Sequence, residues 1–320
     1  MSFYRSNLLH TIQMNQIVVI GSSNLDYIVT VDRFPQGGET LEGSSFSQAM
    51  GGKGANQAVA TRRSGGNVSF ITSVGDDQNG ENALAQYKKE GMDVSRSLVK
   101  ENVTTGAASI WVDSHGENSI VVIPGANQHL TSDYIIPHSD FLSKADIILM
   151  QMEIPYETVK TVCKIASENT KVILNVAPAR SVDDEVLQSL YMLVVNETEA
   201  ETISECKIDE IGEEGVVKAL LEKGVKNVIL TLGSKGSMYS NGTDWLKVPA
   251  FKVQAVDTTA AGDTFCGALV VGIGKYGEMK KALTYATAAS ALCVTALGAQ
   301  PSIPYEKDIL AFLEKNNIHL

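Results

Sequence analysis

Two aspartates and a run of small residues lie together in the last third of the chain, as Asp-Thr-Thr-Ala-Ala-Gly-Asp at 257–263. An apolar stretch of small residues follows and predicts a helix at 266–273. Ala260, Ala261 and Gly262 would offer free backbone N–H groups at its start, where the helix dipole favours an anion such as a transferring phosphoryl group. Asp263, in the first turn, could accept a proton from a substrate hydroxyl. The alternative is that Asp257 or Asp263 merely caps the helix.

A glycine cluster, Gly-Gly-Lys-Gly-Ala-Asn-Gln at 51–57, leads into another predicted helix at 55–63. Glycine lets the backbone approach a polar ligand closely, and the Asn56 amide offers both a donor and an acceptor. The spacing matches neither the P-loop nor the dinucleotide-binding glycine motif. The cluster therefore indicates a polar-ligand site of another kind, or a flexible turn closed by a helix.

Two further segments follow predicted strands: Asn-Glu-Thr-Glu-Ala-Glu at 196–201 and Thr-Leu-Gly-Ser-Lys-Gly at 231–236. Open α/β sheets bind ligands at the carboxyl ends of their strands, so both are candidate nucleotide contacts. Taken singly, the first is equally typical of a solvated helix start and the second of a turn between strands.

The elements that must position these residues alternate along the chain. Buried-strand patterns lie at 17–20, 68–74, 147–150, 172–176, 192–195 and 228–232, and helical patterns lie between them, for example at 55–63, 81–90 and 158–168. This alternation predicts an α/β fold with a doubly wound, mostly parallel sheet flanked by helices.

Two segments break the alternation, because 25–46 and 106–123 are rich in β-branched residues and have no crossover helix. In the first, Leu25, Tyr27 and Val29 fall on one face, and Asp26 falls on the other. The second predicts a hairpin. We expect a small β-sheet lid built from about 24–50 and 104–125, covering a binding crevice.

Composition narrows the class of protein. The 320 residues are 44% hydrophobic and 20% charged, and 26 Lys and Arg against 37 Asp and Glu give a net charge of −11. This is a globular composition, and its acidity disfavours nucleic acid and anionic membranes as partners. The cysteines at 163, 206, 266 and 293 are widely spaced and predict reduced thiols in a cytoplasmic protein. We expect a disordered leader at 1–15 and one α/β domain at 16–320.

Together, the four chemical segments resemble the PfkB carbohydrate kinase family of the ribokinase-like superfamily, from about residue 16 to residue 304. Residues 51–58 and 257–264 match its amino and carboxyl signatures, and Leu-Met-Gln-Met-Glu at 149–153 and Gly-Ala-Gln-Pro-Ser at 298–302 are similar to members acting on ribose. The resemblance implies an ATP-dependent kinase that phosphorylates D-ribose at O5 and releases D-ribose 5-phosphate and ADP.

The resemblance also implies the sugar site. Asp263 would be the base beside the anion hole of Ala260, Ala261 and Gly262, and the sugar hydroxyls would be held by Asn24, Asp26, Gly52, Lys53, Asn56 and Glu153. Carboxylates and amides suit the neighbouring hydroxyls of a sugar. The scarcity of aromatic residues in these motifs argues against a nucleoside.

By the same resemblance, ATP would contact Asn196, Thr231, Gly233, Ser234, Lys235, Gly236, Gly262 and Thr287. Asn196 and Glu199 would organise water bound to Mg²⁺. A monovalent cation, expected to be K⁺, would be held by Asp257, Thr259, Cys293, Ala296, Gly298 and Ser302, several of them through backbone carbonyls.

Two other functions stay open: a kinase for another sugar (fructose, deoxyribose or a ketodeoxy acid), and a sugar-binding protein without turnover. The presence of Asn24, Asp26 and Glu153 favours ribose, and Asp263 beside its small residues favours catalysis. The apolar lid faces, with the resemblance, imply a homodimer paired through the lids. The alternative is a monomer whose lid folds onto its own domain.

Overall fold

The structure, a computed structural model, describes residues 15–320, so the predicted leader lies outside the described residues except for its last one. Among residues 15–320, none of the helices combines the length and hydropathy that a bilayer crossing requires.

The main sheet has the strand order β14-β13-β12-β11-β10-β9-β1-β4. Its strands are β1 (Gln16–Ile20), β4 (Asn67–Ile71), β9 (Ile147–Met150), β10 (Lys171–Asn175), β11 (Met192–Asn196), β12 (Val228–Thr231), β13 (Ser237–Ser240) and β14 (Trp245–Val248). The first six strands pair in parallel. β13 pairs antiparallel with both β12 and β14. The predicted doubly wound, mostly parallel sheet is confirmed.

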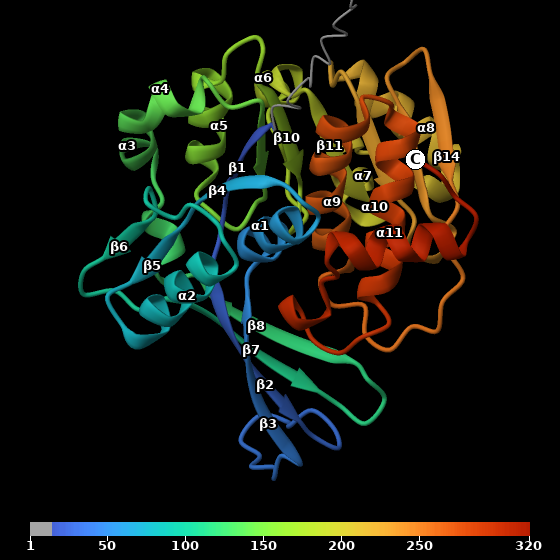
Figure 1. Cartoon of the computed structure of the whole chain (residues 1–320). Coiled ribbons are helices and arrows are strands. Elements are labelled where there is room, and N and C mark those ends of the chain that lie inside the picture. Colours follow the sequence, from blue (N-terminus) through green and yellow to red (C-terminus); the bar gives the residue numbers. More distant parts are fainter. Residues whose placement is uncertain (1–14) are drawn as a thin grey trace, which may run out of the picture.

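Helices cover both faces of this sheet (Figure 1). One core contains Ile17 and Val19 with α1 (Lys53–Arg63), α2 (Gln78–Lys89), α9 (Ala261–Tyr276), α10 (Met279–Cys293) and α11 (Glu306–Lys315). The opposite core contains Val18 and Ile20 with α3 (Ser132–Ile135), α4 (Ser139–Leu142), α5 (Tyr156–Ile165), α6 (Asp184–Ser189), α7 (Glu197–Ser204) and α8 (Ile208–Glu222). Alternate residues of β1 thus enter opposite cores, which explains its continuous apolar sequence.

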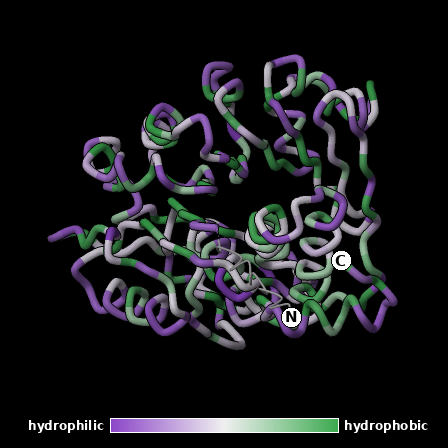
Figure 2. The backbone as a smooth tube through the Cα atoms, turned by 45° about the horizontal axis from the view of Figure 1, so that its top comes forward, coloured by the Kyte–Doolittle hydropathy of each residue, from purple (hydrophilic) through white to green (hydrophobic). Residues whose placement is uncertain are grey.

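Hydropathy along the backbone follows these layers. In Figure 2 hydrophobic stretches recur along the central elements, and hydrophilic stretches occupy much of the outer turns and loops.

A second, smaller sheet projects from the main body (Figure 1). Its order is β3-β2-β7-β8, with β2 (Asn24–Thr30), β3 (Ser45–Gly51), β7 (Gly106–Val112) and β8 (Asn118–Ile123). The β7–β8 pair is the predicted hairpin, and β2 and β7 are parallel neighbours. The register puts Asp26, Ala108 and Val122 side by side, so they share one face of this small sheet.

One predicted strand is divided. The run at 68–74 becomes β4, which ends at Ile71, and β5 (Ser73–Gly75), which pairs with β6 (Leu98–Lys100) in a separate two-stranded sheet. The Thr72 carbonyl accepts the Leu98 N–H, and its N–H donates to Ser97 Oγ. These contacts turn the chain away from the main sheet.

Candidate active site

The chemical segments converge at the carboxyl edge of the main sheet. β1 lies between β4 and β9, so chain connections leave it in opposite directions, as at the ligand-binding crevice of open α/β sheets. Asn24 follows β1, Glu153 follows β9, Asn196 ends β11 and Thr231 ends β12.

Asp263 lies in the first turn of α9 and is only 7% exposed. It does not cap this helix, whose N-cap is Ala260 without a side-chain hydrogen bond. Instead, Oδ2 accepts a hydrogen bond from Asn56 Nδ2, and Oδ1 accepts one from Gln57 Nε2, both at 3.0 Å. The carboxylate is therefore held by α1 from across the site, and the capping alternative is wrong for Asp263.

The amides beside Asp263 differ from the expectation. Ala260 adopts the left-handed conformation with φ of 59°, and this turn lets the Ala261 N–H donate to the Thr258 carbonyl at 3.2 Å. The Ala261 amide is thus occupied, and the expectation that it is free is wrong. Gly262 is exposed, and a Cβ added there would meet nothing within 4 Å. The open space for an anion lies at Gly262.

The residues expected to hold a sugar are positioned by other polar groups. Asn24 Oδ1 accepts from Asn127 Nδ2 at 2.7 Å, and Asn127 Oδ1 accepts from the Ser23 N–H. Glu153 Oε2 accepts from Ser22 Oγ at 2.6 Å and from the Lys53 N–H at 2.9 Å. These bonds fix Asn24 and Glu153 before any ligand binds.

Two glycines of the 51–57 cluster make room for this arrangement. A Cβ at Gly51 would lie 2.0 Å from Asp26 Oδ2. Gly52 has φ of 85°, a conformation that other residues rarely adopt. The cluster is therefore a shaped backbone around a polar site and not a flexible turn.

Carboxylates dominate the electrostatics. Burial, together with the charges of Glu153 and Asp263, raises the pKa of Asp26 to about 7. Burial acts to lower the pKa of Lys53, but Asp263, Glu153 and Glu199 outweigh it and the pKa is raised. Lys53 is thus held as a cation among acidic groups, suited to an anionic or polyhydroxylated ligand.

The pH dependence of stability should report the burial of Asp26. Because its folded pKa of about 7 lies above its ordinary value of 3.8, the folded protein binds this proton more tightly than the unfolded chain. Asp26 therefore makes the free energy of unfolding fall as pH rises through this window, by at most about 1.4 kcal/mol per pH unit. Urea unfolding from about pH 5 to about pH 8 should show a shallower decline for Asp26→Asn than for wild type.

The exposed Asp32 provides the matched control. Asp32→Asn should retain the wild-type slope. An Asp26→Asn slope equal to that of wild type would contradict the proton uptake assigned to Asp26.

On the side expected to bind nucleotide, Asn196 and Glu199 form a capping box. Asn196 Oδ1 accepts from the Glu199 N–H and Glu199 Oε2 accepts from the Asn196 N–H, both at 2.8 Å. The helix-start alternative for this segment is therefore correct in part, although Glu199 is buried and not solvated. Burial raises the pKa of Glu199. The cap uses one oxygen of each side chain and leaves the rest of both groups for another ligand.

The other predicted nucleotide contacts are dispersed around the same edge. Thr231 Oγ1 donates to the Val195 carbonyl at 3.3 Å, and Thr287 Oγ1 is buried without a partner among residues 15–320. Gly233, Ser234 and Lys235 form a short 3₁₀ turn. Lys235 Nζ lies near the carboxylates of Glu197 and Glu213, at 3.6 and 3.5 Å.

Packing alone requires a glycine at position 236, because a Cβ there would lie 2.0 Å from the Val248 carbonyl oxygen. The turn alternative therefore explains this glycine.

The residues expected to hold a monovalent cation are connected by hydrogen bonds. Asp257 Oδ1 accepts from Thr259 N–H and Oγ1, and Oδ2 accepts from the Gly298 N–H at 2.8 Å. Cys293 Sγ lies 3.6 Å from the Thr259 carbonyl oxygen and 3.1 Å from Ser302 Oγ. Ala296 joins them only through its N–H, which donates to the Cys293 carbonyl. Asp257 therefore ties two loops together and does not cap α9.

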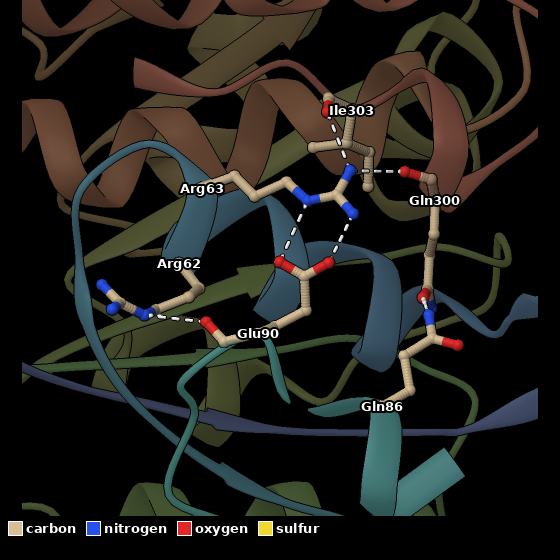
Figure 3. Close-up of polar contacts among 6 residues, drawn as sticks. All are labelled: Arg62, Arg63, Gln86, Glu90, Gln300 and Ile303. Carbon is tan, nitrogen blue, oxygen red and sulfur yellow. Dashed lines mark hydrogen bonds and ion pairs between the residues drawn. The ribbon is translucent and has the colours of Figure 1, made fainter. Parts of the chain in front are cut away.

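The loop that carries Ser302 is fastened to the far end of α1 (Figure 3). Arg63 Nη1 donates to the carbonyls of Gln300 and Ile303 at 2.7 and 2.9 Å. The same guanidinium forms a two-bond ion pair with Glu90, at 2.5 and 3.2 Å. One helix, α1, thus contributes Asn56 and Gln57 to the Asp263 carboxylate at one end and supports the Ser302 loop at the other.

Sequence reasoning missed several residues that organise the site. Asn127 positions Asn24, and the side chains of Gln57, Gln151 and Asn175 form a buried chain behind Asp263. Gln57 lies inside the glycine cluster and Gln151 lies inside the segment at 149–153, so both stood in segments that the sequence singled out. Asn127 and Asn175 occur in none of these motifs.

The fold and the site define an α/β protein with a polar crevice at the carboxyl edge of its sheet and a buried carboxylate at the N-terminus of a helix. The sequence model of the pfkB family of carbohydrate kinases matches residues 14–306. The chain therefore belongs to the PfkB carbohydrate kinase family, and the resemblance is confirmed.

Individual relatives agree with this assignment. A ribokinase of Haemophilus influenzae is 39% identical over 93% of this chain and 98% of its own. Among solved structures, a ribokinase from Thermotoga maritima is 40% identical with a TM-score of 0.85, over 94% of this chain and 99% of its own. A ribokinase of Arabidopsis thaliana complexed with ribose and ATP is 32% identical with a TM-score of 0.84, with the same coverage.

Proposed function

We propose that the protein is an ATP-dependent kinase that transfers the γ-phosphoryl group to O5 of D-ribose. The observation that carries this proposal is the buried Asp263 carboxylate, held by Asn56 and Gln57 beside the open N-terminus of α9. Relatives named ribokinase, along nearly the whole chain, support ribose as the acceptor.

In the proposed mechanism, Asn24, Asp26 and Glu153 bind sugar hydroxyls with Lys53 and Asn56. Asp263 Oδ accepts the proton of the 5-hydroxyl as O5 attacks the γ-phosphorus and the bond to ADP breaks. The Gly262 N–H and the dipole of α9 stabilise the charge that develops on the phosphoryl oxygens. Closure of the small sheet as a lid would exclude water from the reacting phosphoryl group.

A panel of acceptors tests the substrate assignment. Purified protein with ATP and Mg²⁺ should release ADP fastest with D-ribose, measured by a coupled ADP assay. 2-Deoxyribose, fructose and a ketodeoxy acid should be poorer acceptors. A higher kcat/KM for any of them would replace ribose as the substrate, and ADP release with none of them would favour a sugar-binding protein.

Two metal ions belong to the proposal. Oxygen groups suit Mg²⁺, so Asn196 and Glu199 would hold its water shell, and the ion would neutralise phosphate charge. For the monovalent cation, Asp257 supplies negative charge, and one thiol reaches both the Thr259 carbonyl oxygen and Ser302 Oγ, so these oxygens lie close together. The residues present therefore fit both ions, with Cys293 and Ala296 contributing carbonyl oxygens.

We propose the cytoplasm as the location of the protein. The proposed reaction consumes ATP, which the cytoplasm supplies, and the four cysteines are free, as is usual in a reducing compartment.

Activity should depend on the identity of the monovalent cation. Because Asp257 joins the loop before α9 to the Gly298 loop, a cation that fits there would shape the N-terminus of α9 without touching substrate. We expect kcat/KM to rise strongly when K⁺ replaces Na⁺ or a bulky organic cation at constant ionic strength. Equal rates in all three salts would refute the cation site.

We also propose a homodimer that pairs through the small sheets. All of β8 is exposed, and its residues Ile120 to Ile123 are 45–63% exposed. A strand this apolar needs a cover, and a second copy supplies the same surface by two-fold symmetry. Light scattering at micromolar concentration should give twice the 34.3 kDa chain mass, whereas the mass of one chain would exclude the dimer.

A charge on the small sheet should link assembly to sugar affinity. Ile110 lies on the Asp26 face, and Val29 lies on the opposite face. Ile110→Glu and Val29→Glu should each dissociate the dimer and weaken ribose binding, because dimer contacts would hold Asp26 in place. Dissociation with unchanged ribose affinity in titration calorimetry would contradict the link.

A further inference from the structure

A chain of buried amide side chains runs behind Asp263, and the proposed mechanism does not use it. Gln57 is completely buried, and its Nε2 donates both to Asp263 Oδ1 and to Asn175 Oδ1, at 3.0 Å each. Its Oε1 accepts from Gln151 Nε2 at 2.6 Å. These groups come from α1, α9 and the ends of β9 and β10, so four elements meet at one amide.

The orientation of the Gln57 amide is fixed by its neighbours. Asn175 Nδ2 donates to the Val194 carbonyl at 3.1 Å, which turns Asn175 Oδ1 toward Gln57. A flipped Gln57 would place its oxygen against two acceptor oxygens and its NH₂ group against the Gln151 donor. The amide therefore presents an N–H to Asp263 in its one satisfied orientation.

This arrangement is tied to the spacing of two helices. A Cβ at Gly267 would lie 2.6 Å from the Thr61 nitrogen and 2.8 Å from the Gln57 carbonyl oxygen, so α1 and α9 cross in direct contact. The close crossing brings the Gln57 side chain to the first turn of α9. Burying such polar groups is favourable only when their hydrogen bonds are made. The row of buried amides therefore holds the Asp263 carboxylate in a fixed position.

We infer that Gln57 is a positioning residue for the reaction: its Nε2 donates to Asp263 Oδ1 and, with Asn56 on Oδ2, holds the carboxylate in the plane from which it accepts the substrate proton. Asn175 and Gln151 in turn hold Gln57. This inference rests on the proposed role of Asp263 as the base.

Two substitutions separate positioning from space filling. Gln57→Leu keeps the volume and removes the donor, so we expect kcat to fall about tenfold or more while the ribose Kd from calorimetry stays within about threefold. Gln57→Glu is nearly isosteric, and its side chain can donate to Asp263 only when protonated. The kcat of Gln57→Glu relative to wild type should therefore decrease as pH rises from about 6 to about 9.

Gln188→Glu, an exposed change of the same kind on α6, is the matched control, and its ratio to wild type should be independent of pH. A pH-independent ratio for Gln57→Glu, or a kcat of Gln57→Leu within about twofold of wild type, would overturn the inference. If Gln57→Leu does not fold, Gln57→Met replaces it as the apolar variant. If neither folds, the pH profile of Gln57→Glu decides.

Asp263→Asn in the same assay distinguishes the proposed role of Asp263 as the base from the role of Gln57 in positioning it. Full turnover by folded Asp263→Asn would remove the base on which the inference rests. If Asp263→Asn is inactive but the Gln57 variants keep the wild-type kcat, only the role of Gln57 is overturned.

Discussion

Asp263→Ala is expected to lower kcat by roughly 10²- to 10⁴-fold, the usual contribution of a positioned general base. The carboxylate is buried in the first turn of α9 and is aimed by two side-chain donors, so no neighbouring group can replace it at the same place. Ribose binding should largely persist, because Asn24 and Glu153 are positioned by contacts that do not involve Asp263. Steady-state kinetics and calorimetry with ribose measure the two quantities.

Folding must be controlled in this experiment, because alanine removes the acceptor of the Asn56 amide and one of the two acceptors of the Gln57 amide. Each buried unpaired group costs about 1–3 kcal/mol. Asp263→Asn preserves the shape and provides a second test. Wild-type turnover in either folded variant would remove Asp263 from the mechanism.

Gly262→Ala is expected to separate stability from activity. An added Cβ meets nothing within 4 Å and the position is helical, so the fold should gain about 0.5–1 kcal/mol from the reduced freedom of the unfolded chain. The methyl group would nevertheless stand in the open space where the phosphoryl group must approach the helix N-terminus. We expect kcat/KM to fall by about 10²-fold, comparable to losing one donor of an oxyanion hole.

Gly37 is the control, because a Cβ there also meets nothing within 4 Å, and the residue lies in the loop between β2 and β3, away from the N-terminus of α9. Gly37→Ala should keep its activity. A stable Gly262→Ala protein with near wild-type kcat/KM would show that the phosphoryl group does not pass this end of α9.

The six parallel strands of the main sheet were predictable because they are largely buried on both faces and are therefore continuously apolar. The antiparallel strands β13 and β14 were not predicted, because polar residues interrupt β13 and β14 is partly exposed. Residues 147–150 were predicted as a strand and form β9 with the same limits. The break at Thr72 was not predictable, because apolar residues lie on both sides of it and the turn depends on contacts with Ser97 and Leu98.

The candidate site was predictable where its chemistry lies within a short segment, as with Asp263 and Asn56. It was not predictable where partners are distant in sequence: Gln57 and Asp263 are 206 positions apart, and Ser23 and Asn127 are 104 apart. The Ala261 amide is occupied because Ala260 adopts the left-handed conformation. Alanine rarely adopts this conformation, so the sequence did not predict it.

The most direct test of the account is the identity of the product formed from D-ribose, ATP and Mg²⁺. Proton and phosphorus NMR of the reaction mixture should show D-ribose 5-phosphate, with coupling of the phosphorus to the C5 protons, in equal amount to the ADP released. Phosphate on another ribose oxygen, or no phosphorylated ribose at all from folded protein, would contradict the assignment of Asp263 and its surroundings as a site for phosphoryl transfer to O5.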